Sequence, residues 1–187
     1  MRIVSGFLKG KKINFLKSTT TRPLRDFVKE NIFNIINHSK LINVTLENAH
    51  VLDLYSGVGS FGVECVSRGA KKVTFIENDN NALFLLKKNI GYFKIENRIE
   101  IFETKIINFL NQSHKKTKFD IIFLDPPFSE DFYINDLVII KNSNILSKKH
   151  LIIIHRDKNS RDQFSDTINV LLTKTYGRSK IIFAILA

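Results

Sequence analysis

The sequence predicts an α/β fold built on a mostly parallel, doubly wound sheet of seven strands, the last of which is antiparallel. Two observations predict the parallel part. Short apolar runs alternate with amphipathic stretches from residue 49 onward, and one of these runs opens through glycines into a helix at residues 51–62. A third observation predicts the antiparallel strand, because two apolar runs near the carboxyl end flank a short turn at residues 176–178 and indicate a hairpin.

The first 40 residues predict a small hairpin and one helix ahead of the sheet. Residues 2–15 are expected to turn around Lys9 and Gly10, and a Ser/Thr-rich connection follows up to Thr21. A helix then begins near Pro23, since proline suits a first helical turn. Its apolar residues recur at helical spacing and form one stripe: Leu24, Phe27, Val28, Ile32, Ile35 and Ile36.

The remaining elements alternate along the chain. Strands are expected at residues 49–53, 72–76, 98–102, 119–124, 150–154, 168–175 and 179–186. Helices are expected at residues 60–68, 79–90, 104–112 and 133–142. The chain contains no internal repeat or low-complexity linker. We therefore expect a single domain over residues 1–187, with residues 1–40 as a basic appendage.

The composition limits the class of protein. A chain of 187 residues with 43% hydrophobic content has room for one substantial core. Its longest apolar runs have strand length, far short of the roughly 20 residues that span a bilayer, and its first residues show no apolar segment followed by a small-residue cleavage site. The single cysteine, Cys65, excludes a disulfide framework, and the five histidines show no metal-ligand spacing. We expect a soluble, cytoplasmic monomer without a metal.

Positive charge is concentrated near the amino end. The formal net charge is +11, and residues 1–40 hold nine Lys or Arg against two acidic residues, a net of +7. A polyanion such as nucleic acid is the commonest partner for such an excess. The alternative interpretation is a solvated, lysine-rich surface with no partner.

Residues 51–62 form the strongest local signal. Ligands of open α/β sheets bind outside the carboxyl end of the first strand; there Gly57 and Gly59 let the backbone approach a ligand, and the helix start offers free N–H groups. With Gly62, these glycines fit the dinucleotide fingerprint. Asp53 favours S-adenosylmethionine (AdoMet) over a dinucleotide, because its carboxylate would repel a pyrophosphate. It resembles the carboxylate with which AdoMet-dependent enzymes bind the positively charged methionine moiety of the cofactor. The alternative is a glycine-rich turn without a ligand.

The next strand ends in a second carboxylate, Glu77, which can accept both hydroxyls of a ribose. NAD and AdoMet both contain a ribose, so Glu77 does not distinguish them. Asp79 is expected to cap the helix that begins there.

Asp125, Pro126, Pro127 and Phe128 directly follow the strand at residues 119–124. We expect this strand to lie beside the first one, so that its end faces the cofactor's methyl group. An exocyclic base amine is a poor nucleophile, and the Asp125 carboxylate and the Pro126 carbonyl can accept its hydrogens as it attacks. Phe128 offers a face for a base drawn out of its stack. The alternative is a turn or cap residue before a Pro-Pro kink.

These residues predict direct displacement at a sulfonium methyl, driven by alignment and electrostatics, with neither a covalent enzyme intermediate nor a metal. An enzyme that methylates cytosine carbon would need a cysteine at the catalytic loop. Cys65 lies instead inside the helix that follows the glycine loop, among Phe61, Val63 and Val66, and is expected to be a core thiol.

On these residues the chain resembles the bacterial 16S rRNA guanine-N2 methyltransferases of the RsmD type, over nearly its whole length. The matching residues are 2–6, Lys9-Gly10, Arg22-Pro23, Asp26, Val28, Glu30, Phe33-Asn34, 53–59, Gly62, Glu64, 67–70, Glu77, 125–128 and Tyr176-Gly177. The resemblance implies a Rossmann-like class I AdoMet methyltransferase that methylates N2 of one guanine in 16S rRNA. It also implies that the partner is this RNA or the small ribosomal subunit, held in part by the amino-terminal hairpin and helix.

The candidate site residues fall into three groups. The catalytic group is Asp125, Pro126, Pro127 and Phe128. The cofactor-binding group is Asp53, Tyr55, Ser56, Gly57, Gly59, Gly62, Glu77 and Thr104. The RNA-binding group is Arg2, Lys9, Lys11, Lys12, Arg22 and Arg25.

Three places depart from the family pattern. Leu24 and Phe27 stand where such proteins carry a threonine after Arg-Pro and then an Asp-Arg pair. Lys105 occupies the position that normally places Asp or Asn near the adenine, which leaves Thr104 or its preceding glutamate for that role. His155 follows its strand where the family more often has an acid, and we assign it no role.

Other functions stay open on the sequence. One is an amino-methyltransferase that acts on adenine N6 or on a different RNA guanine. Another is an RNA-binding protein with an AdoMet fold and no turnover. An NAD-dependent oxidoreductase is disfavoured, because nothing after the glycine loop resembles a hydride-transfer site.

Overall fold

The computed structural model describes residues 1–187 except 16–23, 113–116, 128–131 and 165. Its α-helices are α1 (Asp26–His38), α2 (Ser60–Ser67), α3 (Asn80–Phe93), α4 (Ile106–Asn111) and α5 (Tyr133–Ser143), with a 3-10 turn at Glu96–Arg98. Its strands are β1 (His50–Leu54), β2 (Lys72–Glu77), β3 (Ile99–Glu103), β4 (Phe119–Leu124), β5 (Leu146–Asp157), β6 (Ile168–Tyr176) and β7 (Ser179–Leu186). Within the described ranges, no helix is long and apolar enough to cross a membrane.

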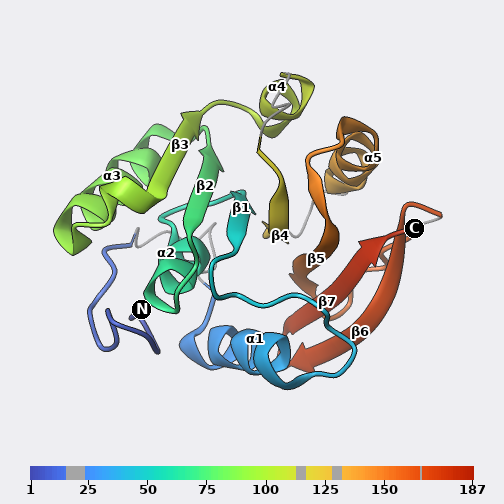
Figure 1. The fold of residues 1–187 in the computed structure, drawn as a ribbon, viewed down its shortest axis with the longest axis horizontal. Coiled ribbons are helices and arrows are strands. Elements are labelled where there is room, and N and C mark those ends of the chain that lie inside the picture. The colour runs from blue at the N-terminus through green and yellow to red at the C-terminus, as the bar shows by residue number, and fades with distance from the viewer. Residues whose placement is uncertain (16–23, 113–116, 128–131, 165) are drawn as a thin grey trace.

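The strands form one sheet in the order β3-β2-β1-β4-β5-β7-β6 (Figure 1). The first five strands of this order pair in parallel, whereas β7 is antiparallel to both β5 and β6. The prediction of a mostly parallel, seven-stranded sheet with an antiparallel last strand is confirmed. Alternation of side chains along each strand gives the sheet two apolar faces. Helices α1, α2 and α3 cover one face, and α4 and α5 cover the other.

Three details of the predicted elements are wrong. Strand β5 extends beyond residues 150–154 in both directions, because its start pairs with β4 and its end pairs with β7. Phe27 does not belong to the buried stripe of α1. Its side chain is 64% exposed and its ring packs edge-on against Tyr176, while Lys29 takes a fully buried place on this helix. The helix begins at Asp26, after the predicted start near Pro23, because Arg25 is an extended N-cap; Pro23 itself lies outside the described residues.

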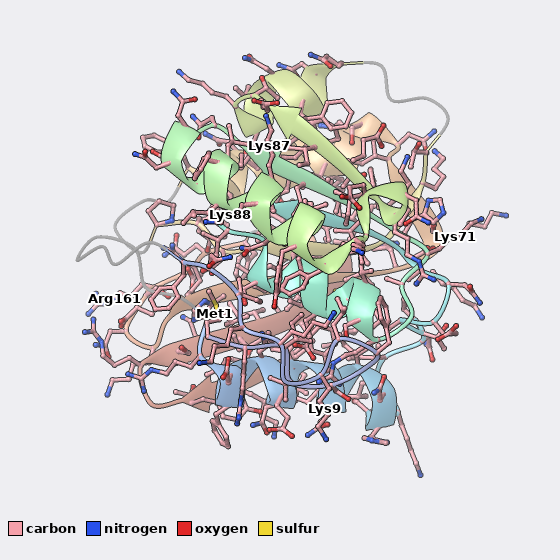
Figure 2. All side chains as sticks on the ribbon, turned by 90° about the vertical axis from the view of Figure 1, so that its left-hand side faces the viewer. Met1, Lys9, Lys71, Lys87, Lys88 and Arg161 are labelled. Atoms are coloured by element: carbon pink, nitrogen blue, oxygen red, sulfur yellow. The ribbon has the colours of Figure 1, made fainter. Side chains whose placement is uncertain are left out.

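The amino-terminal segment packs against α2 and α3 (Figure 2). Its hairpin is held by one antiparallel bridge between Arg2 and Lys12. Two buried side chains receive it: the Ser67 hydroxyl bonds residues 5 and 8, and the Asn89 amide bonds the backbone of Asn14. The apolar side chains of this segment therefore continue the core that lies on one face of the sheet.

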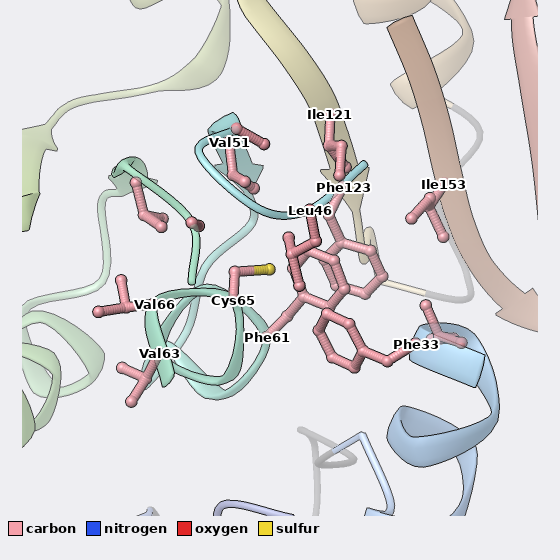
Figure 3. Packing of buried hydrophobic residues seen from close by; sticks show 14 of the residues in the cluster. Phe33, Leu46, Val51, Phe61, Val63, Cys65, Val66, Ile121, Phe123 and Ile153 are labelled. Carbon is pink, nitrogen blue, oxygen red and sulfur yellow. The ribbon is translucent and has the colours of Figure 1, made fainter. Parts of the chain in front are cut away.

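A stack of aromatic rings joins α1 and α2 to the sheet (Figure 3). Phe33 of α1 lies 5.3 Å from Phe61 of α2, and Phe61 lies 4.0 Å from Phe123 of β4. Cys65 is fully buried beside these rings, and burial raises the pKa of its thiol well above the usual range. The prediction of a core thiol is confirmed.

Glu64 connects the amino-terminal segment to α1 and α2 through charge and hydrogen bonds. Its carboxylate is fully buried in α2 and accepts the backbone N–H groups of Val4 and Ser5 at 2.8 and 2.9 Å. It also lies 2.7 Å from the Arg68 Nε and 3.3 Å from the Lys29 Nζ. Burial lowers the pKa of Lys29 and the nearby Glu64 carboxylate opposes that shift, so the two charges depend on each other.

We expect Glu64→Gln to lower the free energy of unfolding by about 3–5 kcal/mol, because it leaves the buried Lys29 ammonium without its carboxylate. Urea denaturation of both proteins measures this difference. Glu100→Gln is the matched control, because it breaks a half-exposed pair with Lys72 and should cost no more than about 1 kcal/mol. Equal losses for the two variants would contradict this account.

Candidate active site

The carboxyl ends of β1, β2 and β4 meet at one edge of the sheet. The register pairs Leu54 of β1 with Ile76 of β2 on one side and with Leu124 of β4 on the other. The glycine loop after β1 therefore lies between the residues that end or follow its neighbours, Glu77 and Asp125. These are the groups that the sequence predicted to share a site, and the sheet brings them together.

The three glycines at positions 57, 59 and 62, which lie in the loop after β1 and in the first turn of α2, serve different purposes. A Cβ on Gly59 would lie 2.4 Å from the Leu86 side chain, and one on Gly62 would lie 2.3 Å from the Phe75 ring. Helix packing therefore requires both of these glycines. Gly57 differs, because it has a φ of +54° and a Cβ there would meet nothing within 4 Å. Only Gly57 borders open space among the three, as expected for a position that faces a ligand.

Asp53 lies beneath the loop. Its carboxylate is 1% exposed and accepts the Gly62 N–H at 3.0 Å, which fixes the first turn of α2. Burial raises the pKa of Asp53 well above its usual range; the Gly62 hydrogen bond opposes the shift, and repulsion from Asp125 and Glu77 adds to it. Three carboxylates near one loop favour a cation, because a positive charge relieves their repulsion. Direct contact between Asp53 and the cofactor stays a prediction.

Glu77 and Ser56 hold the loop in place. One Glu77 oxygen accepts the Gly57 N–H at 2.7 Å, and the other accepts the N–H groups of residues 78 and 79. The Ser56 hydroxyl points inward, where it donates to the Asp53 carbonyl and accepts the Ile76 N–H. The structure therefore gives Ser56 a supporting position behind the loop, and Glu77 remains the candidate for the ribose hydroxyls.

The remaining cofactor candidates flank this pair. The Thr104 N–H donates to the Glu77 carbonyl at 3.0 Å, which puts the start of the β3–α4 loop beside β2. Glu103 is paired at 2.7 Å with the exposed Lys87. On the other side, the Tyr55 hydroxyl donates to Asp136 of α5 at 2.6 Å. Burial raises the pKa of Asp136, and the bond from Tyr55 opposes that shift.

Asp125 begins the catalytic candidate group and is held from β5. Its Oδ1 lies 2.8 Å from the Nδ1 of His155, and the Pro127 carbonyl accepts a hydrogen bond from the Arg156 guanidinium at 3.0 Å. We assigned no role to these two β5 residues from the sequence. Phe128 lies outside the described residues.

The candidate RNA-binding residues are exposed where the structure describes them, and Arg22 lies outside the described residues. The exposed ones are Arg2, Lys9, Lys11, Lys12 and Arg25. They are spread along the hairpin and the residue before α1, and Arg2 and Lys12 are bridged to each other. The Arg2 carbonyl accepts from Lys29, whose ammonium also reaches Ser60 at the start of α2. The turn with Lys9 docks near Ser67, at the far end of this helix, roughly 10 Å away along its axis.

Within the described part of the chain, no group of three or more His, Cys, Asp or Glu side chains is placed to hold a metal ion.

The fold and this site define the class of protein: a Rossmann-like class I methyltransferase, a class whose cofactor is AdoMet. The open side of Gly57 and the carboxylates around it fit a cofactor with a positive charge. The chain belongs to the family described as Conserved hypothetical protein 95, which matches residues 1–185. The resemblance inferred from the sequence is thereby confirmed.

Two sequence relatives illustrate this membership. The chain is 33% identical to ribosomal RNA small subunit methyltransferase D of Haemophilus influenzae over 95% of its own length and 89% of that protein. It is 30% identical to the putative rRNA methyltransferase YlbH of Bacillus subtilis, over 95% and 94% of the two chains.

Solved structures agree with the fold. A putative methyltransferase from Escherichia coli superimposes with a TM-score of 0.82 at 25% identity, covering 98% of this chain and 96% of the other. A putative methylase from Haemophilus influenzae gives a TM-score of 0.77 at 29% identity, with the same coverage.

We expect Gly57→Ala to weaken AdoMet binding about tenfold or more, because the added methyl group occupies the open side of the loop. Isothermal titration calorimetry measures the change. The left-handed backbone costs a Cβ roughly 1–2 kcal/mol of stability. Gly177→Ala is the matched control, since its φ of +61° and its open surroundings repeat those conditions in the β6–β7 turn. Equal AdoMet affinity in the two variants would remove Gly57 from the ligand site.

Proposed function

We propose that this chain transfers a methyl group from AdoMet to the exocyclic N2 of a guanine in 16S rRNA, at the position numbered 966. The observation that carries the proposal is Asp125, which follows β4 beside the glycine loop and is held by His155 at 2.8 Å. Relatives named ribosomal RNA small subunit methyltransferase D support an rRNA substrate, because they match most of the chain at about 30% identity.

The residues proposed to hold AdoMet surround the ends of β1, β2 and β3: Asp53, Tyr55, Ser56, Gly57, Gly59, Gly62, Glu77 and Thr104. Bound AdoMet supplies a methyl group on a positively charged sulfonium. Asp53 and Glu77 favour this charge, and the N–H group of Gly57 is already fixed by Glu77. Ser56 and the two packed glycines act by keeping the loop in this shape.

On the acceptor side, the Asp125 carboxylate and the Pro126 carbonyl are proposed to accept the two hydrogens of the guanine amine. That contact aligns the nitrogen with the methyl group and supports rehybridisation as the new bond forms. Arg156 binds the following carbonyl, that of Pro127, and so fixes the main chain of the loop. Phe128 is proposed to stack on the extruded base.

Residues 1–40 are proposed to contact rRNA, since this segment carries a net charge of +7 and its described lysines, apart from the buried Lys29, are exposed. Arg2 and Lys12, which are bridged to each other, lie nearer the start of α2, whereas Lys9 lies at the hairpin turn and would meet RNA farther from the target base. An rRNA substrate would place the activity in the cytoplasm, and a monomer is our prediction for the free protein.

We expect the purified protein to transfer labelled methyl from AdoMet to 16S rRNA or to assembled small subunits, and to yield N2-methylguanosine. Asp125→Ala should lower the rate by about 100-fold or more, because one acceptor of the amine is lost. Nucleoside digestion followed by mass spectrometry identifies the product and its position.

Glu100→Ala is the control for this assay, since it removes an exposed carboxylate on β3 and should methylate at the wild-type rate. Label found only in DNA, or only as N6-methyladenosine, would refute the guanine proposal. RNA binding with no transfer in any substrate would favour the non-catalytic alternative.

We expect Lys9→Ala combined with Lys11→Ala to weaken rRNA binding and to reduce the slope of log affinity against log salt by about 2, one for each lost phosphate contact. Fluorescence anisotropy over a range of salt concentrations measures it. Lys148→Ala with Lys149→Ala is the matched control, because these exposed lysines begin β5, well apart from residues 1–15 (Figure 1). Equal slopes for the two double variants would contradict the proposed contact.

A further inference from the structure

The end of β5 is joined to the loop that follows β4 at two points. The parallel register pairs Leu124 with Ile154, so the next residues along the two strands, Asp125 and His155, are neighbours. The first point is the contact of 2.8 Å between their side chains. The second is the hydrogen bond of 3.0 Å from Arg156 to the Pro127 carbonyl. Consecutive residues of one strand therefore hold both a side chain and the main chain of the loop.

His155 is fixed on both of its nitrogens. It is 2% exposed, and its Nε2 lies 2.9 Å from the hydroxyl of Ser179 on β7. With the hydrogen on Nδ1, the ring donates to Asp125 and accepts from Ser179, so both contacts are satisfied. Asp125 is 24% exposed, and among the described residues its second oxygen, Oδ2, has no hydrogen-bond partner. One carboxylate oxygen is thus occupied by the protein, and the other is left for a donor from outside.

Arg156 is equally constrained. It is 1% exposed, its Nε donates to Asp162 at 2.9 Å, and its guanidinium lies 4.6 Å from the centre of the Tyr133 ring. Asp162 also accepts from Tyr133, Ser160 and Lys180 at 2.6–2.8 Å. Burial raises the pKa of Asp162, but these hydrogen bonds outweigh it and lower the pKa to about 2. The anchor of Arg156 is therefore ionised at neutral pH.

We propose that His155 is a positioning residue for methyl transfer: it holds Asp125 in the orientation that presents its second oxygen to the substrate amine. The inference rests on the proposed function. Two acceptors can bind both hydrogens of an amine only if each acceptor lies within about 0.5 Å and 10–20° of the position that methyl transfer requires. Asp125 alone would rotate about its side-chain bonds, whereas the bond to a buried ring that is fixed from the other side by Ser179 removes this freedom. Arg156 holds the backbone of the same loop, so the carbonyl acceptor is fixed as well.

The test compares three substitutions of His155 in the full-length protein. His155→Asn places an amide donor near the Nδ1 position and can restore the bond to Asp125. His155→Gln places its amide near the Nε2 position and reaches only toward Ser179, and His155→Leu makes neither bond. Initial rates on small ribosomal subunits give kcat and KM, calorimetry gives the affinity for AdoMet, and thermal unfolding gives stability.

For Leu and Gln we expect kcat to fall by about 10- to 100-fold, the range for one lost hydrogen bond to a charged group. The KM for the subunit and the affinity for AdoMet should change by less than about threefold, because His155 acts through Asp125 alone. For Asn we expect kcat within about threefold of wild type. A structural role alone would lower stability and activity together in all three and would give no rescue by Asn.

Wild-type kcat in the Gln variant, or the same loss in Asn and Gln, would overturn the inference. The comparison between the Asn and Gln variants tests the inference even if the Leu variant does not fold, because both variants carry an amide and differ only in which hydrogen bond that amide can form. If the wild-type protein itself methylates neither 16S rRNA nor small subunits, the proposed function fails instead, so the two failures are distinguishable.

Discussion

The parallel pairing of β1 with β2 and β4 is the constraint on which the site depends. Parallel strands end at the same edge of a sheet, so the residues that follow them meet although they are far apart in the chain. Glu77 and Asp125 reach the glycine loop in this way. A shift of β4 by one residue would turn its buried side chains to the opposite face, and the apolar cores on both faces of the sheet oppose such a shift.

Buried polar side chains hold the loops at this edge of the sheet. Asp53 and Ser56 are turned inward and form hydrogen bonds to backbone groups of the loop and of the strand beside it. On the other side of β4, His155 and Arg156 are almost fully buried and hold the residues after that strand. Burying a polar group without a hydrogen-bond partner costs free energy, so losing any of these contacts would destabilise the folded state. Buried side chains beneath the loops that follow β1 and β4 therefore fix the conformation of these loops.

Buried polar side chains also attach the amino-terminal segment to the rest of the fold. The buried Glu64 carboxylate pairs with two cations and accepts two backbone N–H groups. Ser67 and Asn89 form further hydrogen bonds to the backbone of this segment. The apolar side chains of this segment join the core beside α2. Its basic side chains therefore have a fixed location relative to the glycine loop, as a segment that helps to orient a large RNA would require.

The sequence by itself determined the order of the elements, because apolar runs of strand length alternate with helical periodicity. It also predicted that Asp53, Gly57 and Asp125 lie at one edge of the sheet, because each stands at or just after the end of a strand. It did not reveal that Phe27 is exposed while Lys29 is buried, or that His155 binds Asp125. Those outcomes depend on partners distant in the chain, Glu64 for Lys29 and the strand register for His155, which no local pattern encodes. Only the tertiary structure decided them, since burial of a polar group is settled by the group that it meets.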